Sequence, residues 1–457
     1  MSYRIKIQDE KNRYELTELA KMFAPAEELE LSDGTEEETS EGASAEVFAV
    51  PGPEEMDRNA QKRALFSYLA EKTGVVPDWG TLTGVRPGKL FSQLSKRLGS
   101  PDNAEEALKK EYFVTDSKIG LLRNTWEVQQ RVKCDKSPAA CGVYVGIPFC
   151  PTRCLYCSFT SNRFKEDAAA KYLKALYKEI AAVSEMMEQR GLYAESIYIG
   201  GGTPTSLTDS MFSEMVQSVS GAFLRPKTVE FTVECGRPDT ITEAKLKAIK
   251  TAGAGRISIN PQTMKQRTLE LIGRHHTPVQ IEEAFALARS CGMECINMDL
   301  IAGLPQESPE DFEASLSKVT GLGPENITVH TLAVKRGSRL IEEDSGYSYR
   351  QGSTVRHMLE KGSAILKEEG YEPYYLYRQK HMAGNFENVG YCRGNTASLY
   401  NMRIMEEDQT IIALGAGGIS KVYYPAEDRL ERVANVSNYE IYIDRIDEMI
   451  KRKEEGL

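Results

Sequence analysis

The pattern of hydrophobic positions changes character near residue 141. From there on, short apolar, β-rich runs alternate with segments whose apolar residues recur at helical spacing, such as Tyr172, Leu176 and Val183. The sequence predicts strands at 143–147, 196–199, 228–233, 257–260, 295–300 and 327–332, and helices at 168–187, 242–252 and 280–291. Such alternation is typical of a right-handed parallel β/α array. Six units predict an open, partial (β/α)6 barrel of the α/β class.

The segment before this barrel has a different pattern. A strand-like run at 3–8 is followed by a helical stretch, and the acidic, turn-rich run at 27–45 predicts a solvated loop. Apolar residues at helical spacing predict a second helix at 57–73, after which Pro and Gly residues break the pattern. We therefore expect a separate N-terminal α+β accessory domain over residues 1–135.

The alternation is lost near residue 345, which places the barrel at 136–345. A helix is predicted at 354–369, and it is followed by tyrosine-rich and glycine-rich stretches, the latter at 415–418, and by a charged terminal helix. We expect residues 346–457 to form a small C-terminal cap domain.

Length and composition agree with several soluble domains. The chain has 457 residues, of which 41% are hydrophobic and 27% are charged. A net charge of −10 argues against a general nucleic-acid-binding protein, because phosphate contacts require basic surfaces. The sequence shows no apolar signal core at its start and no uncharged apolar run of the roughly 18 residues that a membrane span requires. We expect a cytoplasmic protein with neither a nucleic acid nor a membrane as partner.

Three of the nine cysteines form a cluster directly after the first predicted barrel strand. The sequence GIPFCPTRCLYCSF separates Cys150, Cys154 and Cys157 by three and two residues. Thiolates are the usual ligands of iron–sulfur clusters, and three of them would leave one iron of a four-iron cluster open to a small molecule. The alternative is a zinc site or unreactive buried cysteines, although no fourth Cys or His lies within the loop.

Flexible or polar residues follow the next strands at the same end of the predicted barrel. Gly201, Gly202 and Thr203 end the second strand, where glycines let the backbone approach a ligand closely. The ends of the third, fourth and fifth strands carry Glu234, Gln262 and Asp299. Side chains at the carboxyl ends of parallel strands are candidates for hydrogen bonds to a ligand. The alternative interpretation is a tight turn and ordinary exposed loop residues.

The cysteine spacing, with Tyr156 before the last cysteine, resembles the signature of radical S-adenosylmethionine enzymes. This resemblance implies a [4Fe–4S] cluster on Cys150, Cys154 and Cys157, whose open iron binds the amino and carboxylate groups of S-adenosylmethionine. Cleavage of that cofactor gives a 5′-deoxyadenosyl radical, which abstracts hydrogen from an inert C–H bond. The resemblance also implies that the turn at 200–204 binds the methionyl amino group.

Longer stretches narrow the resemblance to one branch. Oxygen-independent coproporphyrinogen III oxidases and their relatives contain stretches similar to FTVECGRPDTIT, RISINPQTMKQRTLELIGRHHT and NMDLIAGLPQES. Two further stretches, WGTLTGVRPGKL at 79–90 and NVGYCRGNTASLYN at 388–401, look like the HemZ branch of that family. The residues implied to contact S-adenosylmethionine, one molecule or two, are Tyr144, Tyr156, Gly201, Gly202, Thr203, Glu234, Gln262, Arg274 and Asp299.

By this resemblance the chain is an oxidoreductase of porphyrin and haem biosynthesis. It would oxidatively decarboxylate two propionates of coproporphyrinogen III to vinyl groups and so form protoporphyrinogen IX. The implied partners are the porphyrinogen substrate and a low-potential electron donor such as flavodoxin or ferredoxin.

Two other functions stay open. One is a haem-binding or haem-delivery protein that retains the cluster; the haem-chaperone branch is marked by an HNxxYW-like motif, where this chain has YNMRIM at 400–405. The other is a radical enzyme with a different substrate, such as a methyl transferase.

Several further residues have both a functional and a structural interpretation. His330, at the end of the sixth strand, either faces the barrel mouth or is a hydrogen-bonded structural residue, and at least one of His275 and His276 is expected at the surface. The tyrosines that either line a porphyrin cavity or fill the core are Tyr374, Tyr375 and Tyr377. The cysteines expected to be ordinary packing residues are Cys235, Cys291, Cys295 and Cys392.

Overall fold

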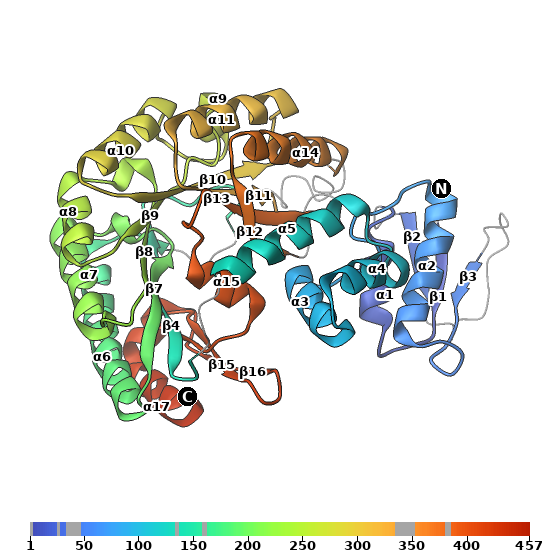
Figure 1. Ribbon diagram of the computed structural model, residues 1–457. Coiled ribbons are helices and arrows are strands. Elements are labelled where there is room, and N and C mark those ends of the chain that lie inside the picture. The colour runs from blue at the N-terminus through green and yellow to red at the C-terminus, as the bar shows by residue number, and fades with distance from the viewer. Residues whose placement is uncertain are drawn as a thin grey trace.

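The structure is a computed structural model (Figure 1). It describes residues 3–24, 28–32, 47–132, 137–157, 162–333, 352–379 and 385–457. Most of the predicted acidic loop at 27–45 lies outside the described residues. No helix of the described chain is long and apolar enough to cross a membrane.

The N-terminal segment forms a small parallel sheet with its own core. Strand β1 (Tyr3–Ile7) lies between β2 (Leu29–Ser32) and β3 (Val47–Val50), and helices α1 (Arg13–Ala20) and α2 (Arg58–Thr73) pack on it. The strand β2 falls inside the predicted loop, because its leucines pack against this core and its backbone pairs with β1. Helix α2 confirms the predicted second helix.

Three helices connect this sheet to the barrel. They are α3 (Pro87–Leu98), α4 (Pro101–Tyr112) and α5 (Asp116–Val132). Gly99, in the left-handed conformation, ends α3, and Ser100 caps α4 by accepting a hydrogen bond from the backbone N–H of Asn103. The apolar faces of these helices belong to the same hydrophobic core as the barrel strands.

The central part confirms the predicted α/β barrel. Parallel strands β4 (Ala140–Ile147), β7 (Tyr193–Gly201), β8 (Glu230–Gly236), β9 (Arg256–Ile259), β10 (Cys295–Ala302) and β11 (Asn326–Thr331) are hydrogen-bonded in this order. The helices between them are α6 (Glu166–Gln189), α7 (Asp209–Phe223), α8 (Glu243–Thr251), α9 (Gln266–Leu271), α10 (Pro278–Ser290) and α11 (Pro309–Leu322). They form an outer layer around the sheet in Figure 1. Capping boxes begin α10 at Thr277 and α11 at Ser308.

The C-terminal segment extends this sheet at both ends. Beyond β11 lie β13 (Glu387–Cys392) and β12 (Glu372–Arg378), and beyond β4 lie β14 (Ile411–Leu414), β15 (Ile419–Tyr424) and β16 (Arg429–Ala434). The described part of the sheet therefore has eleven strands. The helices of this segment are α14 (Gly352–Glu368), α15 (Leu399–Glu406), α16 (Tyr439–Asp444) and α17 (Ile446–Gly456). The proposed division into three domains stays a prediction. The strands before and after the predicted boundary near residue 345 belong to one continuous sheet.

Candidate functional site

The cluster loop is anchored on both sides. It leaves β4, forms the short strand β5 (Phe149–Cys150), and returns through β6 (Asn162–Arg163), which pairs with β5. The backbone N–H of Leu155 donates to the carbonyl of Ile272, 3.0 Å away, and thereby ties the loop to the segment that carries Arg274. All three cysteines are half-buried and unbridged. The loop therefore presents its thiols at the carboxyl end of the barrel strands.

The glycine turn at the end of β7 lies against this loop. A Cβ atom on Gly202 would lie 2.6 Å from the carbonyl oxygen of Phe149 and 2.9 Å from Cys150 Sγ. Gly201 has φ of +113°, and a Cβ there would lie 2.8 Å from the Ile147 carbonyl oxygen. Only glycine fits at either position, so the turn packs backbone directly on the cluster loop. The hydroxyl of Thr203 donates to Cys150 Sγ over 3.5 Å.

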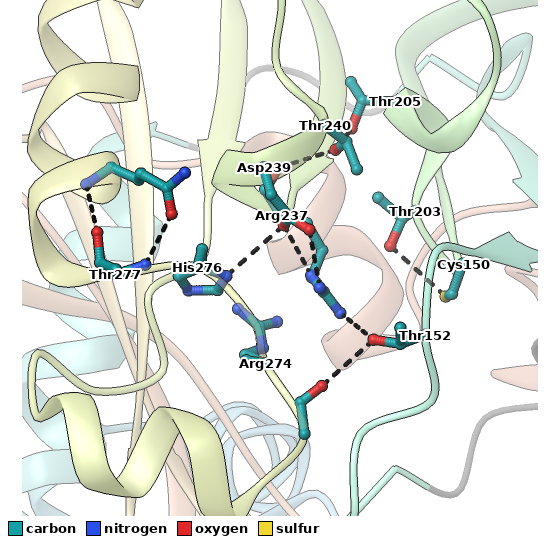
Figure 2. Close-up of polar contacts among 12 residues, drawn as sticks. Cys150, Thr152, Thr203, Thr205, Arg237, Asp239, Thr240, Arg274, His276 and Thr277 are labelled. Atoms are coloured by element: carbon teal, nitrogen blue, oxygen red, sulfur yellow. Dashed lines mark hydrogen bonds and ion pairs between the residues drawn. The ribbon is translucent and has the colours of Figure 1, made fainter.

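A buried arginine joins the loop to the end of β8 (Figure 2). Arg237 donates Nε and Nη2 to the two carboxylate oxygens of Asp239, at 3.0 and 2.9 Å, and Nη1 to Thr152 Oγ1 at 2.8 Å. Thr152 donates onward to the carbonyl of Gly273 at 3.2 Å. The sequence analysis did not single out Arg237, although it stands in the GRPD motif next to Glu234. These contacts hold three segments of the barrel rim in register.

Like Arg237, His276 points toward Asp239 (Figure 2). Its Nδ1 lies 3.6 Å from Asp239 Oδ1, which is too long for a hydrogen bond, and burial lowers the pKa of the imidazole. His276 is fully buried, whereas His275 is exposed. The expectation that at least one of the pair lies at the surface is confirmed.

The two strand-end carboxylates have different electrostatic surroundings. Burial raises the pKa of Glu234 to about 7, although it accepts a 2.5 Å hydrogen bond from the Tyr198 hydroxyl. Burial also acts to raise the pKa of Asp299, but hydrogen bonds to neighbouring side chains outweigh it and lower that pKa. At neutral pH Asp299 is ionised, and Glu234 is poised between its two forms.

One cavity collects every residue that the sequence analysis proposed for the site. Its volume is about 560 Å³, and it opens at the carboxyl ends of the barrel strands. Its described lining includes Tyr144, Cys150, Cys154, Tyr156, Cys157, Gly201, Gly202, Thr203, Glu234, Gln262, Arg274 and Asp299. The structure thus brings these residues together, while their individual roles stay predictions.

Unsatisfied polar atoms around this cavity are compatible with a polar ligand. Gln262 Oε1, Asn260 Oδ1 and Arg274 Nε are buried and have no hydrogen-bond partner among the described residues. Gln262 also has a left-handed backbone with φ of +69°, which costs free energy for a residue other than glycine. A ligand with amine, carboxylate and hydroxyl groups would satisfy such atoms.

The thiols suit a cluster of several irons. Among the described residues, no group of three His, Cys, Asp or Glu side chains lies close enough to hold a single metal ion. A [4Fe–4S] cluster does not require such convergence, because each thiolate binds a different iron. The donor set and the backbone cradle around Cys150 therefore fit the proposed cluster.

Several residues outside the predicted set also line the cavity. Tyr375 and Tyr377 do so, whereas Tyr374 packs in a neighbouring apolar core. His330 lines the cavity, so it faces the barrel mouth rather than the core. Asn388 and Asn401 line it as well and bound the NVGYCRGNTASLYN stretch, but no spacing rule in the sequence marks them. Such residues come from strands and a helix that meet the barrel only through long-range pairing.

A larger cavity of about 830 Å³ lies between α5 and α14. Its buried charges, Lys118 and Glu387, pair with each other at 2.6 Å. Its described lining contains none of the predicted site residues. We therefore place the chemistry in the smaller cavity, where thiols and unsatisfied polar atoms converge.

Comparison with known proteins agrees with this geometry. The family model of the radical SAM superfamily matches residues 144–319. The oxygen-independent coproporphyrinogen-III oxidase-like protein HemZ of Bacillus subtilis is 40% identical over 431 residues, which cover 89% of this chain and 84% of the relative. The chain belongs to the radical SAM superfamily and, within it, to the HemZ family.

The chain is also similar in sequence to a heme chaperone and in structure to a coproporphyrinogen III oxidase. The heme chaperone HemW of Bacillus subtilis is 29% identical over 67% of this chain and 76% of its own length. The solved structure of the Escherichia coli coproporphyrinogen III oxidase HemN, a radical SAM enzyme, matches with a TM-score of 0.55 and 22% identity, over 70% of this chain and 72% of that one. The HemN match shows a shared fold.

Proposed function

We propose that the chain is a radical S-adenosylmethionine oxidoreductase that converts coproporphyrinogen III to protoporphyrinogen IX without oxygen. The observation that carries the proposal is the single cavity in which the three thiols face the unsatisfied polar atoms and strand-end side chains. Cys150, Cys154 and Cys157 would hold the [4Fe–4S] cluster. A low-potential donor such as flavodoxin or ferredoxin would reduce it.

The chain's own residues would bind and orient the cofactor. The turn at Gly201 and Gly202 packs its backbone against the loop at Cys150 and would offer backbone groups to a methionyl amino group, and Thr203 lies beside Cys150. Glu234 and Gln262 would accept hydrogen bonds from hydroxyl and amine groups, and Arg274 would pair with a carboxylate. Held by these residues, the cofactor would supply the radical chemistry that removes hydrogen beside a propionate.

A haem-binding role is the second candidate, because the heme chaperone HemW matches two thirds of the chain. By the resemblance, the chaperone's HNxxYW-like motif corresponds to YNMRIM at 400–405, which begins with Tyr400. Tyr400 is buried and stacks on Tyr198, with ring centroids 4.6 Å apart. That position therefore supplies no imidazole for a haem iron, which favours the enzyme.

An anaerobic assay tests the proposal. The protein is reconstituted with iron and sulfide, then mixed with reductant, S-adenosylmethionine and coproporphyrinogen III, and both products are separated by chromatography. We expect 5′-deoxyadenosine and protoporphyrinogen IX to form together. 5′-Deoxyadenosine alone would mean radical chemistry on another substrate, and retained haem without either product would favour the haem-binding role.

A further inference from the structure

The cavity continues beyond the strands that carry the predicted cofactor contacts. Those contacts come from β4, the cluster loop and β7 to β10, whereas β11, β13, β12 and α15 form a second wall. The described residues of this second wall are Thr328, His330, Thr331, Tyr375, Tyr377, Gln379, Asn388, Asn401 and Met405. No residue of this wall belongs to the predicted cofactor set, so it is available for the substrate.

The second wall combines flat aromatic surface with neutral polar groups. The rings of Tyr375 and Tyr377 are nearly parallel, with an interplanar angle of 8° and centroids 6.4 Å apart. Tyr375 is buried, so the half-buried Tyr377 is the ring with surface for contact with a pyrrole ring of a substrate. Asn388 Oδ1 is already used, since it accepts a hydrogen bond from the backbone N–H of Thr331 at 2.8 Å.

Positive charge for a substrate carboxylate is scarce in this cavity. Its described lining contains two arginines, and both serve the cluster side: Arg237 is bound to Asp239 and Thr152, and Arg274 donates to the carbonyl of Asn260. On the second wall, His330 is the one described side chain that can carry positive charge. Its side chain is about one quarter exposed to the cavity.

Asp299 orients this imidazole. His330 Nε2 lies 3.5 Å from Asp299 Oδ2, and Asp299 itself accepts a 2.7 Å hydrogen bond from Asn297. A carboxylate beside one ring nitrogen leaves the other ring nitrogen to interact elsewhere. His330 can therefore present an imidazole N–H on the wall that also carries the two tyrosines.

We propose that His330 binds a carboxylate of the substrate, and that the second wall is the substrate subsite. The substrate is then an acid with flat ring surface, as a propionate-bearing tetrapyrrole is. This inference rests on the proposed function and assigns a specificity residue to it. The carboxylate bound by His330 would be one that the reaction retains.

Binding measurements with two ligands test this assignment. Cluster-loaded protein is titrated anaerobically with coproporphyrin III, which has four carboxylates, and with its uncharged tetramethyl ester in the same dilute detergent. We expect His330→Gln to weaken binding of the acid about ten- to hundredfold, as for a lost hydrogen bond to a charged group, and to leave the ester unchanged. His330→Lys should keep most of the preference for the acid, and His357→Gln, an exposed histidine on α14, should match the wild type.

These measurements distinguish the role of His330 from the proposed function. Equal affinities of the wild type and His330→Gln for the acid would overturn the role of His330 while leaving the proposed function intact. A wild type that binds neither tetrapyrrole would contradict the proposed function, and this inference would fall with it. Iron content, measured on each variant, should not change.

Discussion

The cavity thiols differ from other cysteines of the described chain in their surroundings. Cys141, Cys235 and Cys392 are buried, and burial raises the pKa of each thiol to about 12. Such thiols stay protonated and unreactive at neutral pH. Cys291 and Cys295 are half-buried like the loop cysteines but lie outside the cavity, so the loop is set apart by holding three thiols together at the cavity.

Replacing one loop cysteine should remove the cluster without unfolding the barrel. In Cys154→Ala, we expect anaerobic reconstitution to leave little bound iron and no cleavage of S-adenosylmethionine, while circular dichroism stays native. Cys291→Ala removes a half-buried thiol outside the cavity and serves as the control. Full iron content and cofactor cleavage in Cys154→Ala would refute the ligand assignment.

Arg237 should contribute to both stability and cluster retention. Arg237→Gln leaves Asp239 without its ion pair and Thr152 without its donor. Because Asp239 is partly exposed, we expect the free energy of unfolding to fall by about 2 kcal/mol, below the range for a fully buried broken pair. Iron content after reconstitution should fall as well. Arg225→Gln, which replaces an exposed arginine, is the control. The same stability and iron content in both variants would show that the contacts of Arg237 do not hold the cluster loop in place.

The raised pKa of Glu234 predicts a pH-dependent cost to the folded state. Its pKa is about 7 when folded, above the usual value of 4.5, so the folded state binds the extra proton. Stability from this group is present below pH 4.5 and is lost as the pH rises through 7. We expect Glu234→Gln, without cluster or cofactor, to gain on the order of 2 kcal/mol relative to the wild type between pH 5 and 8. Parallel stability curves in urea titrations would contradict this.

At the scale of elements, the barrel was predictable and its flanks were not. The strands β4 and β7 to β11 follow from local apolar runs, because most of their residues are buried. By contrast, β14 pairs with β4 across some 270 residues of sequence, Ile411 opposite Gly142, and no local pattern encodes that pairing. Some residues of the site were likewise predictable from the sequence, and others were not. The cysteines and strand ends have spacing signals, whereas Tyr375, Asn388 and Arg237 depend on which segments meet.

Helix α17 is fixed to the barrel by a buried ion pair. Lys453 Nζ and Glu179 Oε1 lie 2.7 Å apart with both side chains fully buried, and Glu179 Oε2 accepts from the backbone N–H of Gly415 at 2.8 Å. This carboxylate therefore joins α17, α6 and the glycine-rich loop after β14. That loop contributes Ala416 and Gly417 to the cavity lining.

Breaking this pair should destabilise the protein far more than breaking an exposed pair nearby. Lys453→Met leaves a buried carboxylate without its cation, and we expect a loss of about 3 to 5 kcal/mol in denaturant unfolding. Lys178→Met, on the same two helices, breaks an exposed pair with Asp447 and should cost less than about 1 kcal/mol. A small, equal effect of both substitutions would show that α17 is not anchored in this way.

At the scale of the whole molecule, the predicted accessory region 1–135 contains two parts that pack differently. The sheet β1–β3 has a separate core, but the WGTLTGVRPGKL stretch is built into the barrel edge. Trp79 Nε1 donates to Glu387 Oε2 at 2.8 Å, and Arg378 donates to the carbonyl of Leu82 at 2.6 Å. Both partners lie on strands next to the cavity wall. The region 77–132 therefore supports the site.

Two truncations test this division. A chain of residues 77–457 should fold and bind iron like the full chain, because it loses only the separate core. A chain of residues 137–457 should be insoluble or strongly destabilised, since it exposes the apolar faces that α3 to α5 cover and leaves Glu387 without its partners. A stable, iron-loaded 137–457 chain would instead support the boundary near residue 135.

The central claim is that the cysteine cavity generates a radical that acts directly on a porphyrinogen. The most direct measurement uses coproporphyrinogen III deuterated at the propionate carbons next to the pyrrole rings, with mass spectrometry of the 5′-deoxyadenosine formed under anaerobic conditions. The account predicts deuterium in 5′-deoxyadenosine, in proportion to the vinyl groups of protoporphyrinogen IX formed. 5′-Deoxyadenosine without deuterium, and without protoporphyrinogen IX, would contradict it.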